Sequence, residues 1–517
     1  MKRKHAGIGH RDAKRQWLGT SSPLALSSLA PATLALSSFI FVAGATPASA
    51  DNCFTASGNP FLAAFANATG GQTHCGKEPG FTIQSPLVDP NGDALPVFFM
   101  MGADNVSGNV ILAQGSSLEN LGFAAAPAAV QGQIVAFNLS KGLPATFPGS
   151  FPGGLVITQS SIAGFVENAG HIHGELINAT GMGPFAGERV PATNGILITR
   201  TAFSGGAAGI INSGLMELSS GPADFAQANK LGPFAVTGIT LNGSTLTGNI
   251  TNSGTIMASA AAAANGVSAK GIVLGGGPDF GRAPMNFTGN IVNTLAISAD
   301  GAGLVATGIE VDAAAGTIRA GIVNSGVLTV SGTNGASGVG IKASTPITGG
   351  ITNAGILTAS TAAIDLTQET GGSTAITQAG GLMAGNVLGG GGDSFNLTGG
   401  TLALTATNRV NGLASFTQSA AGTLALQVTP STAPSTYPTI HAGTIALGGT
   451  LQVLPTGVLA NYVNGVTFKD VFSASTPITG SFASITFSSC TARLRKRLTN
   501  FALVNTASPA ARRKLGS

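Results

Sequence analysis

A short alternating pattern recurs along the middle of the chain and limits its possible folds more than any other feature. In the clearest copy, Ile322, Asn324, Gly326 and Leu328 occupy every second position. A period of two is typical of an extended strand. Asn followed two residues later by Gly suits a bend, because both residues tolerate a positive φ. We therefore predict that each copy forms a strand, a bend at Asn and a second strand.

Six further copies follow the same frame, and the last of them is degraded. They are centred on the amides Asn168, Asn212, Asn252, Asn293, Asn353 and Gln378. A second alternating run accompanies them and begins at Gly195, Gly238, Gly271, Gly308, Gly340 and Ala363. Successive amides stand 44, 40, 41, 31, 29 and 25 residues apart, which excludes a rigid short repeat and indicates coils with turns of variable length. Internal repetition of this kind predicts a solenoid.

The amides also predict a polar feature inside the solenoid. A single coil cannot bury its own apolar side chains, so the next coil has to cover them. Stacked coils place the seven amides above one another, where they can hydrogen-bond as a ladder. Such bonds satisfy polar groups that cost about 1–3 kcal/mol each when buried without partners. The alternative is that these Asn residues are only turn formers at the surface.

Composition supports one all-β body. The chain has 517 residues, of which 9% are charged and 43% hydrophobic, so it is too apolar for a solvated coil. Segments with a helical period are missing. Six basic residues precede Asp51 and seven follow Cys490, which leaves 11 basic and 19 acidic residues between them and a net charge of −8. The basic pI therefore belongs to the two ends, and nothing in the body suggests nucleic-acid binding.

The chain divides into four segments. Residues 1–50 have a basic head, an apolar stretch and Ala48, Ser49 and Ala50 before Asp51, which predicts a signal peptide. The alternative, a membrane anchor, lacks the uninterrupted run of about 20 apolar residues that it needs. Residues 51–160 are expected to form an N-terminal cap and irregular first coils, and residues 161–488 the regular repeats of the solenoid. Residues 489–517 form a basic tail that we expect to be disordered, truncated or frame-shifted.

Two cysteines follow the predicted signal peptide. Cys53 and Cys75 enclose about 20 residues, and a disulfide between them would gain roughly 3 kcal/mol from loop closure in an oxidising compartment. We predict this disulfide, which would hold the N-terminal cap.

The repeats resemble the coils of autotransporter passenger domains. The resemblance rests on Gly248 to Ile256 (GNITNSGTI), Gly350 to Leu357 (GITNAGIL) and Gly391 to Leu397 (GGDSFNL). Ile478 to Ile485 (ITGSFASI) is similar to the segment that ends many such passengers. The resemblance implies a right-handed parallel β-helix, exported through the periplasm and displayed at the cell surface or secreted. It also implies an outer-membrane translocator barrel, for which the roughly 30 residues after Ile485 are too few.

Catalytic and metal-binding motifs were weighed against simpler interpretations. Asp393, Ser394 and Phe395 lie in a block similar to the nucleophile block of GDSL-type esterases, but the only later histidine is His441, and a Ser nucleophile needs a base within reach. The same block resembles one imperfect copy of a calcium-binding glycine-rich repeat. The simpler interpretation of the block is a glycine-rich turn.

A pair of histidines could hold zinc. His171 and His173 share one face of a predicted strand, with Glu167 and Glu175 nearby, and zinc takes three or four such ligands. Polar residues on a solvent-exposed face are the simpler interpretation. We therefore predict no catalytic residue, no metal site and no cofactor.

Two functions remain. The first is a non-enzymatic adhesin whose exposed faces and loops, such as the Gly-rich stretches near 274–288 and 386–400, bind molecules on a host or neighbouring cell. The second is a β-helix enzyme that acts on carbohydrates or esters.

Overall fold

The computed structural model of the protein describes most of residues 160–487 and several shorter stretches. The main part is interrupted at 177–192, 205–208, 221–233, 261–266, 276–284, 303, 313–316, 430–436 and 457–467. The shorter stretches are 77–78, 81–83, 98–101, 105–106, 109–112, 114, 117–121, 153–158 and 503–504. All of them belong to the larger of two compact units, Ala50–Ser517. The predicted signal peptide, Cys53 and Cys75 lie outside the described residues.

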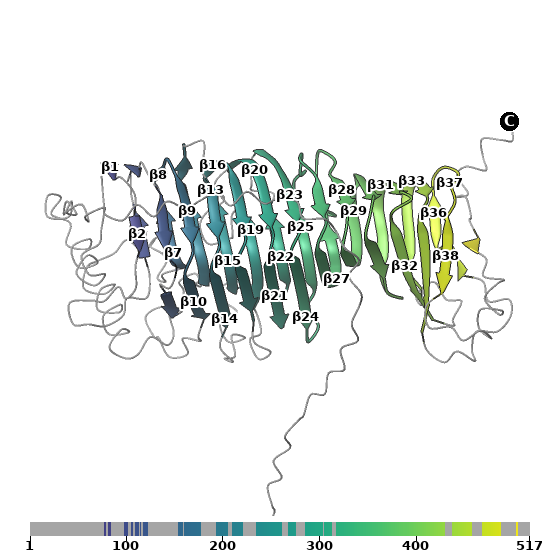
Figure 1. Ribbon diagram of the computed structural model, residues 1–517, viewed down its shortest axis with the longest axis horizontal. Coiled ribbons are helices and arrows are strands. Elements are labelled where there is room, and N and C mark those ends of the chain that lie inside the picture. The colour runs from purple at the N-terminus through teal and green to yellow at the C-terminus, as the bar shows by residue number, and fades with distance from the viewer. Residues whose placement is uncertain are drawn as a thin grey trace, which may run out of the picture. The chain divides into compact units, whose positions relative to one another are not determined.

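Every regular element in this part of the chain is a β-strand, and every strand pairing is parallel. Each strand pairs with the corresponding strand of the preceding and following coils, so the strands form three faces (Figure 1). The chain is therefore a parallel β-helix, which confirms the solenoid that the repeat predicts and the parallel β-helix that the resemblance implies. No helix in the described residues has the length and apolar character needed to cross a lipid bilayer.

The first face carries the Gly-Ile motif. Its separate strands are β3 (Phe98–Met101), β7 (Gly153–Thr158), β11 (Thr193–Thr199), β15 (Phe234–Asn242), β19 (Val267–Leu274), β22 (Ala306–Val311), β25 (Gly338–Ala343) and β36 (Phe472–Ala474). Longer strands share this face with another: β27 (Ile356–Asp365), β29 (Leu382–Leu397), β31 (Arg409–Gln418) and β33 (Thr439–Leu447). The motif glycine lies against the third face, since a Cβ at Gly238 would stand 2.4 Å from Ile256 Cγ2.

The second face carries the amides. Short corner strands lead into it: β1 (Lys77–Glu78), β4 (Asn105–Val106), β8 (Ser161–Ile162), β12 (Ala202–Phe203) and β16 (Thr245–Thr247). The face consists of β2 (Phe81–Ile83), β5 (Val110–Leu112), β9 (Phe165–Asn168), β13 (Gly209–Asn212), β17 (Asn249–Asn252), β20 (Asn286–Asn293), β23 (Thr317–Asn324), β26 (Ile351–Asn353), β28 (Ala375–Gln378), the ends of β29, β31 and β33, and β37 (Thr479–Gly480). β20 and β23 also supply the corner strand of their own coils.

The third face follows the Asn bend. Its strands are β6 (Ser117–Leu121), β10 (His171–Leu176), β14 (Leu215–Ser220), β18 (Thr255–Ser259), β21 (Ala296–Ala302), β24 (Val327–Thr333), the starts of β27 and β29, β30 (Thr401–Leu404), β32 (Thr423–Val428), β34 (Thr450–Pro455) and β38 (Ser484–Phe487). Separately, β35 (Phe468–Lys469) pairs with β39 (Leu503–Val504), so two residues of the basic tail are in a strand.

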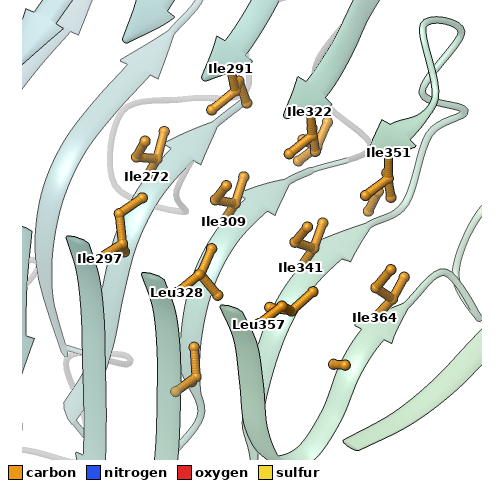
Figure 2. Packing of buried hydrophobic residues seen from close by; sticks show 14 of the residues in the cluster. Ile272, Ile291, Ile297, Ile309, Ile322, Leu328, Ile341, Ile351, Leu357 and Ile364 are labelled. Atoms are coloured by element: carbon orange, nitrogen blue, oxygen red, sulfur yellow. The ribbon is translucent and has the colours of Figure 1, made fainter. Parts of the chain in front are cut away.

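Inward aliphatic side chains form three rows, one from each face (Figure 2). Ile309, Ile322 and Leu328 belong to one coil and lie beside the equivalent residues of the next, and all three are at most 1% exposed. Burying such a side chain is worth about 1.5–3 kcal/mol. Stacking thus supplies the cover that one coil lacks.

The Gly-rich stretch near 386–400 is not the loop predicted from the sequence, because residues 386–397 belong to the 16-residue strand β29. This strand serves all three faces in one turn of the solenoid, and its register with β31 is irregular between Leu388 and Asp393, where residues 390–392 are exposed. Gly385 and Gly391 turn it at the corners with φ values of 130° and 103°, which only glycine adopts readily.

Candidate functional site

The amides of the second face form a continuous internal ladder. Asn168 Nδ2 donates to Asn212 Oδ1 at 2.7 Å, and the same bond repeats to Asn252 (2.7 Å), Asn293 (2.8 Å), Asn324 (2.7 Å), Asn353 (2.7 Å) and Gln378 (2.8 Å). All seven side chains are fully buried. The structure therefore brings together every amide in the repeat, inside the solenoid and not at its surface.

Each amide also uses its second hydrogen. Asn252 Nδ2 donates to Ala296 O of the next coil at 2.9 Å, and Asn324 Nδ2 donates to Ile356 O at 3.0 Å. The backbone O of Asn212 accepts the N–H groups of Ser253 and Gly254, both at 2.8 Å. The ladder thus fastens each bend to the bend of the next coil through side chain and backbone together.

The glycine of the bend has a different role from the one predicted. Neither Asn252 nor Gly254 is among the described residues with positive φ, so conformational freedom is not the reason for this glycine. A Cβ at Gly254 would instead stand 2.0 Å from Gly214 O of the preceding coil, a distance that real side chains do not adopt. The bends stack so closely that only a hydrogen atom fits between them.

One bend departs from this rule. Leu295 occupies the glycine position, and its side chain is 51% exposed. The following bond, from Ala296 N to Gly254 O, is 3.3 Å, compared with 2.9 Å for the equivalent bond from Thr255 N to Gly214 O. A side chain at this position is therefore accommodated by a looser contact between coils.

The ladder ends where aliphatic residues take its place. Leu112 is the register partner of Asn168 on one side, and Leu397 is the partner of Gln378 on the other. Asn168 Oδ1 is buried without a hydrogen-bond donor, because leucine supplies none. Beyond Leu397, Gln418 resumes the amide position and donates to Gly422 O and Thr450 O. Sequence reasoning missed Gln418, although Phe416 and Thr417 precede it much as Ile376 and Thr377 precede Gln378.

The proposed esterase residues do not meet. Ser394 is the register partner of Ser415, which pairs with Thr444, three residues beyond His441 on β33. Ser394 and His441 are thus two coils apart and displaced along the strand. Asp393 is fully buried and accepts hydrogen bonds from backbone N–H groups of Thr374 and Gly390. This arrangement gives Ser394 no base among these residues.

Among the described residues, the side chains considered as zinc ligands do not form a group of three, although the ring centroids of His171 and His173 lie 6.2 Å apart. His171 Nε2 lies 3.0 Å from Glu217 Oε2 on the next coil, and both side chains are 39% exposed. Glu167 stands on the other side of the bend and accepts a hydrogen bond from Ser213 Oγ at 2.6 Å. The side chain of Glu175 lies outside the described residues. No group of three His, Cys, Asp or Glu side chains suited to a metal ion occurs in the described part of the chain.

A solvent-exposed apolar patch stands out on the third face. Its members are Met257, Leu295, Val327 and Ile356, which are 36%, 51%, 40% and 40% exposed, and we call them the apolar stripe. Val327 is the register partner of Ile356 and of Ala296, which follows Leu295, so Leu295, Val327 and Ile356 lie on neighbouring coils beside the Asn bend. Met257 is the register partner of Ser298 and lies further along the third face. Hydroxyl side chains border it: Thr358 Oγ1 donates to Thr329 Oγ1 at 3.4 Å, and Ser331 Oγ donates to Asp300 Oδ1 at 2.6 Å.

The fold and these surfaces define the class of the chain as a parallel β-helix solenoid with a buried amide ladder. Comparison with protein families, with curated proteins and with solved structures finds no match.

Proposed function

We propose that the chain is a non-enzymatic, adhesin-like passenger of the autotransporter kind, exported through the periplasm and displayed at the cell surface or secreted. The apolar stripe is the observation that carries the proposal. Exposed apolar residues that cluster on a regular sheet commonly mark interaction sites. The partner is a surface molecule of a host or neighbouring cell, and an outer-membrane translocator delivers the passenger.

The stripe suits binding more than catalysis. Its side chains offer contact area on a framework fixed by the ladder, while hydroxyls at its border offer hydrogen bonds. The four side chains of the stripe are apolar, and none of them can act as an acid, a base or a nucleophile. A surface built on hydrogen-bonded strands loses little backbone conformational entropy when it binds.

The test measures binding of purified, fluorescently labelled protein to cultured cells and to bacterial cells. Val327→Lys with Ile356→Lys should lower the amount bound by about tenfold, because charges placed at the centre of an interface remove its anchors. Thr245→Lys with Thr247→Lys is the matched control, since both residues are exposed at the β16 corner, away from the third face. The control should bind like the wild type, and both proteins should keep the all-β circular-dichroism spectrum.

Two results would count against the proposal. One is full binding by the stripe variant. The other is turnover of p-nitrophenyl esters or polysaccharides by the wild-type protein, which would favour the carbohydrate-active or ester-hydrolysing alternative.

A further inference from the structure

Two acidic side chains are buried together at the corner between the first and second faces. Asp393 on β29 is fully buried, and Glu369, in the connection between β27 and β28, is 8% exposed. Asp393 Oδ1 accepts the Thr374 N–H at 2.7 Å, and Oδ2 accepts the Gly390 N–H at 2.6 Å. Asp393 therefore joins the β27–β28 connection, residues 366–374, to β29.

Glu369 is held by the same connection. Its Oε2 accepts a hydrogen bond from Thr374 Oγ1 at 2.8 Å, and that hydroxyl in turn accepts the Ile347 N–H at 2.9 Å. Its other oxygen, Oε1, is buried and has no hydrogen-bond donor. Gly390 lies so close that a Cβ there would stand 3.2 Å from Glu369 O and 3.3 Å from Glu369 Cβ. The carboxyl group is thus enclosed, with one oxygen unsatisfied.

The two carboxyl groups have unequal environments. Both oxygens of Asp393 accept backbone N–H groups. Glu369 has one hydroxyl donor and a second, buried oxygen to which no group donates, which favours its neutral form. Burial is the largest cause that raises the pKa of Glu369, and the charge of Asp393 and a hydrogen bond to Asp393 raise it further, against the lowering effect of the Thr374 hydroxyl.

The other charged groups nearby are engaged elsewhere. Asp365, at the end of β27, accepts hydrogen bonds from Thr367 N and Oγ1 and is the register partner of Lys342 on β25. Arg409 on β31 donates to the backbone oxygens of Ala406, Asn408 and Tyr437. Among the residues that the structure describes, Asp393 is the only charged group that acts on the Glu369 carboxyl.

We propose that Glu369 is a proton-operated latch. When protonated, its carboxyl group donates to Asp393 and holds residues 366–374 against β29. When the proton leaves, two carboxylates face each other in a buried site, Glu369 turns out to water, and the connection opens. Each opening of residues 366–374 releases one proton from the Glu369 carboxyl group to solvent.

The direction of the pH response follows from the raised pKa. Because folding favours the neutral form of Glu369, this group contributes its full stability when the pH is below 4.5, the ordinary pKa of a glutamate. That stability is lost as the pH rises through the folded-state pKa of Glu369. Opening of residues 366–374 therefore increases with pH, opposite to the usual response of a hydrogen-bonded carboxylate.

Hydrogen exchange of the purified protein tests the latch, with peptides covering 366–374 and 388–394 followed from about pH 4 to about pH 8. After correction for the intrinsic exchange rate, protection in the wild type should fall by up to about tenfold per pH unit between the ordinary value of 4.5 and the raised, folded-state pKa of Glu369, as expected for loss of one proton, and it should level off above that pKa. Glu369→Gln should abolish this slope, because the amide keeps a donor toward Asp393 and an acceptor for Thr374. Asp300→Asn, at an exposed carboxylate, is the control and should keep the wild-type slope.

Three outcomes would overturn the latch: a flat wild-type profile, a Glu369→Gln profile as steep as the wild type, or recovery of wild-type protection at high pH on adding about 1 mM calcium chloride, which would assign the pair to a cation. If Glu369→Gln does not fold, Asp393→Asn decides. Removing the Asp393 charge should move the midpoint to lower pH, and an unchanged midpoint would contradict the coupling.

Discussion

Asn324 Nδ2 donates to Asn353 Oδ1 at 2.7 Å, joining two residues that are 29 positions apart in the sequence and fully buried. The same nitrogen donates to Ile356 O at 3.0 Å, so both amide hydrogens are used. This one side chain therefore satisfies an acceptor on each of two segments of the next coil, and its own Oδ1 satisfies Asn293.

Replacing Asn324 should weaken the solenoid at its centre. Asn324→Leu would leave Asn293 Nδ2 without its Oδ1 acceptor and Asn353 Oδ1 without its donor. Unsatisfied buried groups cost about 1–3 kcal/mol each, so we expect a loss of about 3 kcal/mol in the free energy of unfolding. Urea denaturation followed by circular dichroism measures this loss.

A second asparagine is the matched control for this variant. Asn290 Oδ1 accepts the Gly321 N–H at 3.0 Å, but Asn290 is exposed. Asn290→Ala should cost less than about 1 kcal/mol, since water can replace an exposed partner. Equal losses of unfolding free energy in Asn324→Leu and Asn290→Ala would show that burial of the ladder adds no stability.

Substituting Gly254 separates close approach from backbone conformation. Its added Cβ would stand 2.0 Å from Gly214 O, while its φ is not positive. Gly254→Ala and Gly254→Asn should therefore both destabilise the protein, by about 1–3 kcal/mol, because neighbouring coils must move apart. The midpoint of chemical denaturation measures the change.

Gly335 shows the opposite behaviour and serves as the control. Its φ is 86°, and nothing lies within 4 Å of an added Cβ. Gly335→Ala should cost about 1 kcal/mol from the left-handed conformation, and Gly335→Asn should cost less, since Asn tolerates that region. If Asn rescued Gly254 in the same way, the close-approach explanation would be wrong.

The fold class could be predicted from the sequence because the pattern that indicates it is local. Alternating Ile, Asn and Gly indicate a strand, a bend and a strand without knowledge of distant residues. The fold class is confirmed. The reason for the glycine was not visible, because the contact between Gly254 and Gly214 O depends on how neighbouring coils stack. The role of Gly391 was also hidden, since a glycine-rich run equally suits a loop and a strand that turns a corner.

The features of the site that escaped prediction depend on register. Glu369 and Asp393 are 24 residues apart and share no motif, so only the fold places them together. A usable signal did exist, since few residues of this chain are charged and each acid beside a glycine-rich run merits attention. The apolar stripe was hidden as well, because its members come from separate coils.

An ion pair between coils should contribute measurable stability. Lys270 Nζ lies 2.6 Å from Glu310 Oε2, and the two side chains are 24% and 16% exposed. Lys270→Met would leave the mostly buried Glu310 without this partner, so we expect a loss of about 1–3 kcal/mol. Glu310→Gln in the Lys270→Met background should restore part of the loss, because it removes the unpaired charge. A double-mutant cycle from denaturation curves measures the coupling, and a coupling of zero would contradict it.

Acid should destabilise the C-terminal coils through His441. Burial lowers the pKa of His441, and the nearby charge of Arg409 lowers it further, while Asp470 acts in the opposite direction. The unfolded chain therefore takes up a proton near the ordinary value of 6.5, before the folded chain does. Stability linked to His441 is present in full above that pH and is lost as the pH falls through the lower, folded-state value.

His441→Gln tests this response, since glutamine keeps polar contacts but does not titrate. The melting temperature of the wild type should fall more steeply below about pH 6.5 than that of His441→Gln, while the two should run parallel above it. The control is His171→Gln, which removes a half-exposed histidine paired with Glu217 on another coil. Because His171 is half-exposed and lies outside the C-terminal coils, that variant should not flatten the acid-induced loss. A His441→Gln curve that follows the wild type throughout would assign the acid sensitivity of these coils to other groups.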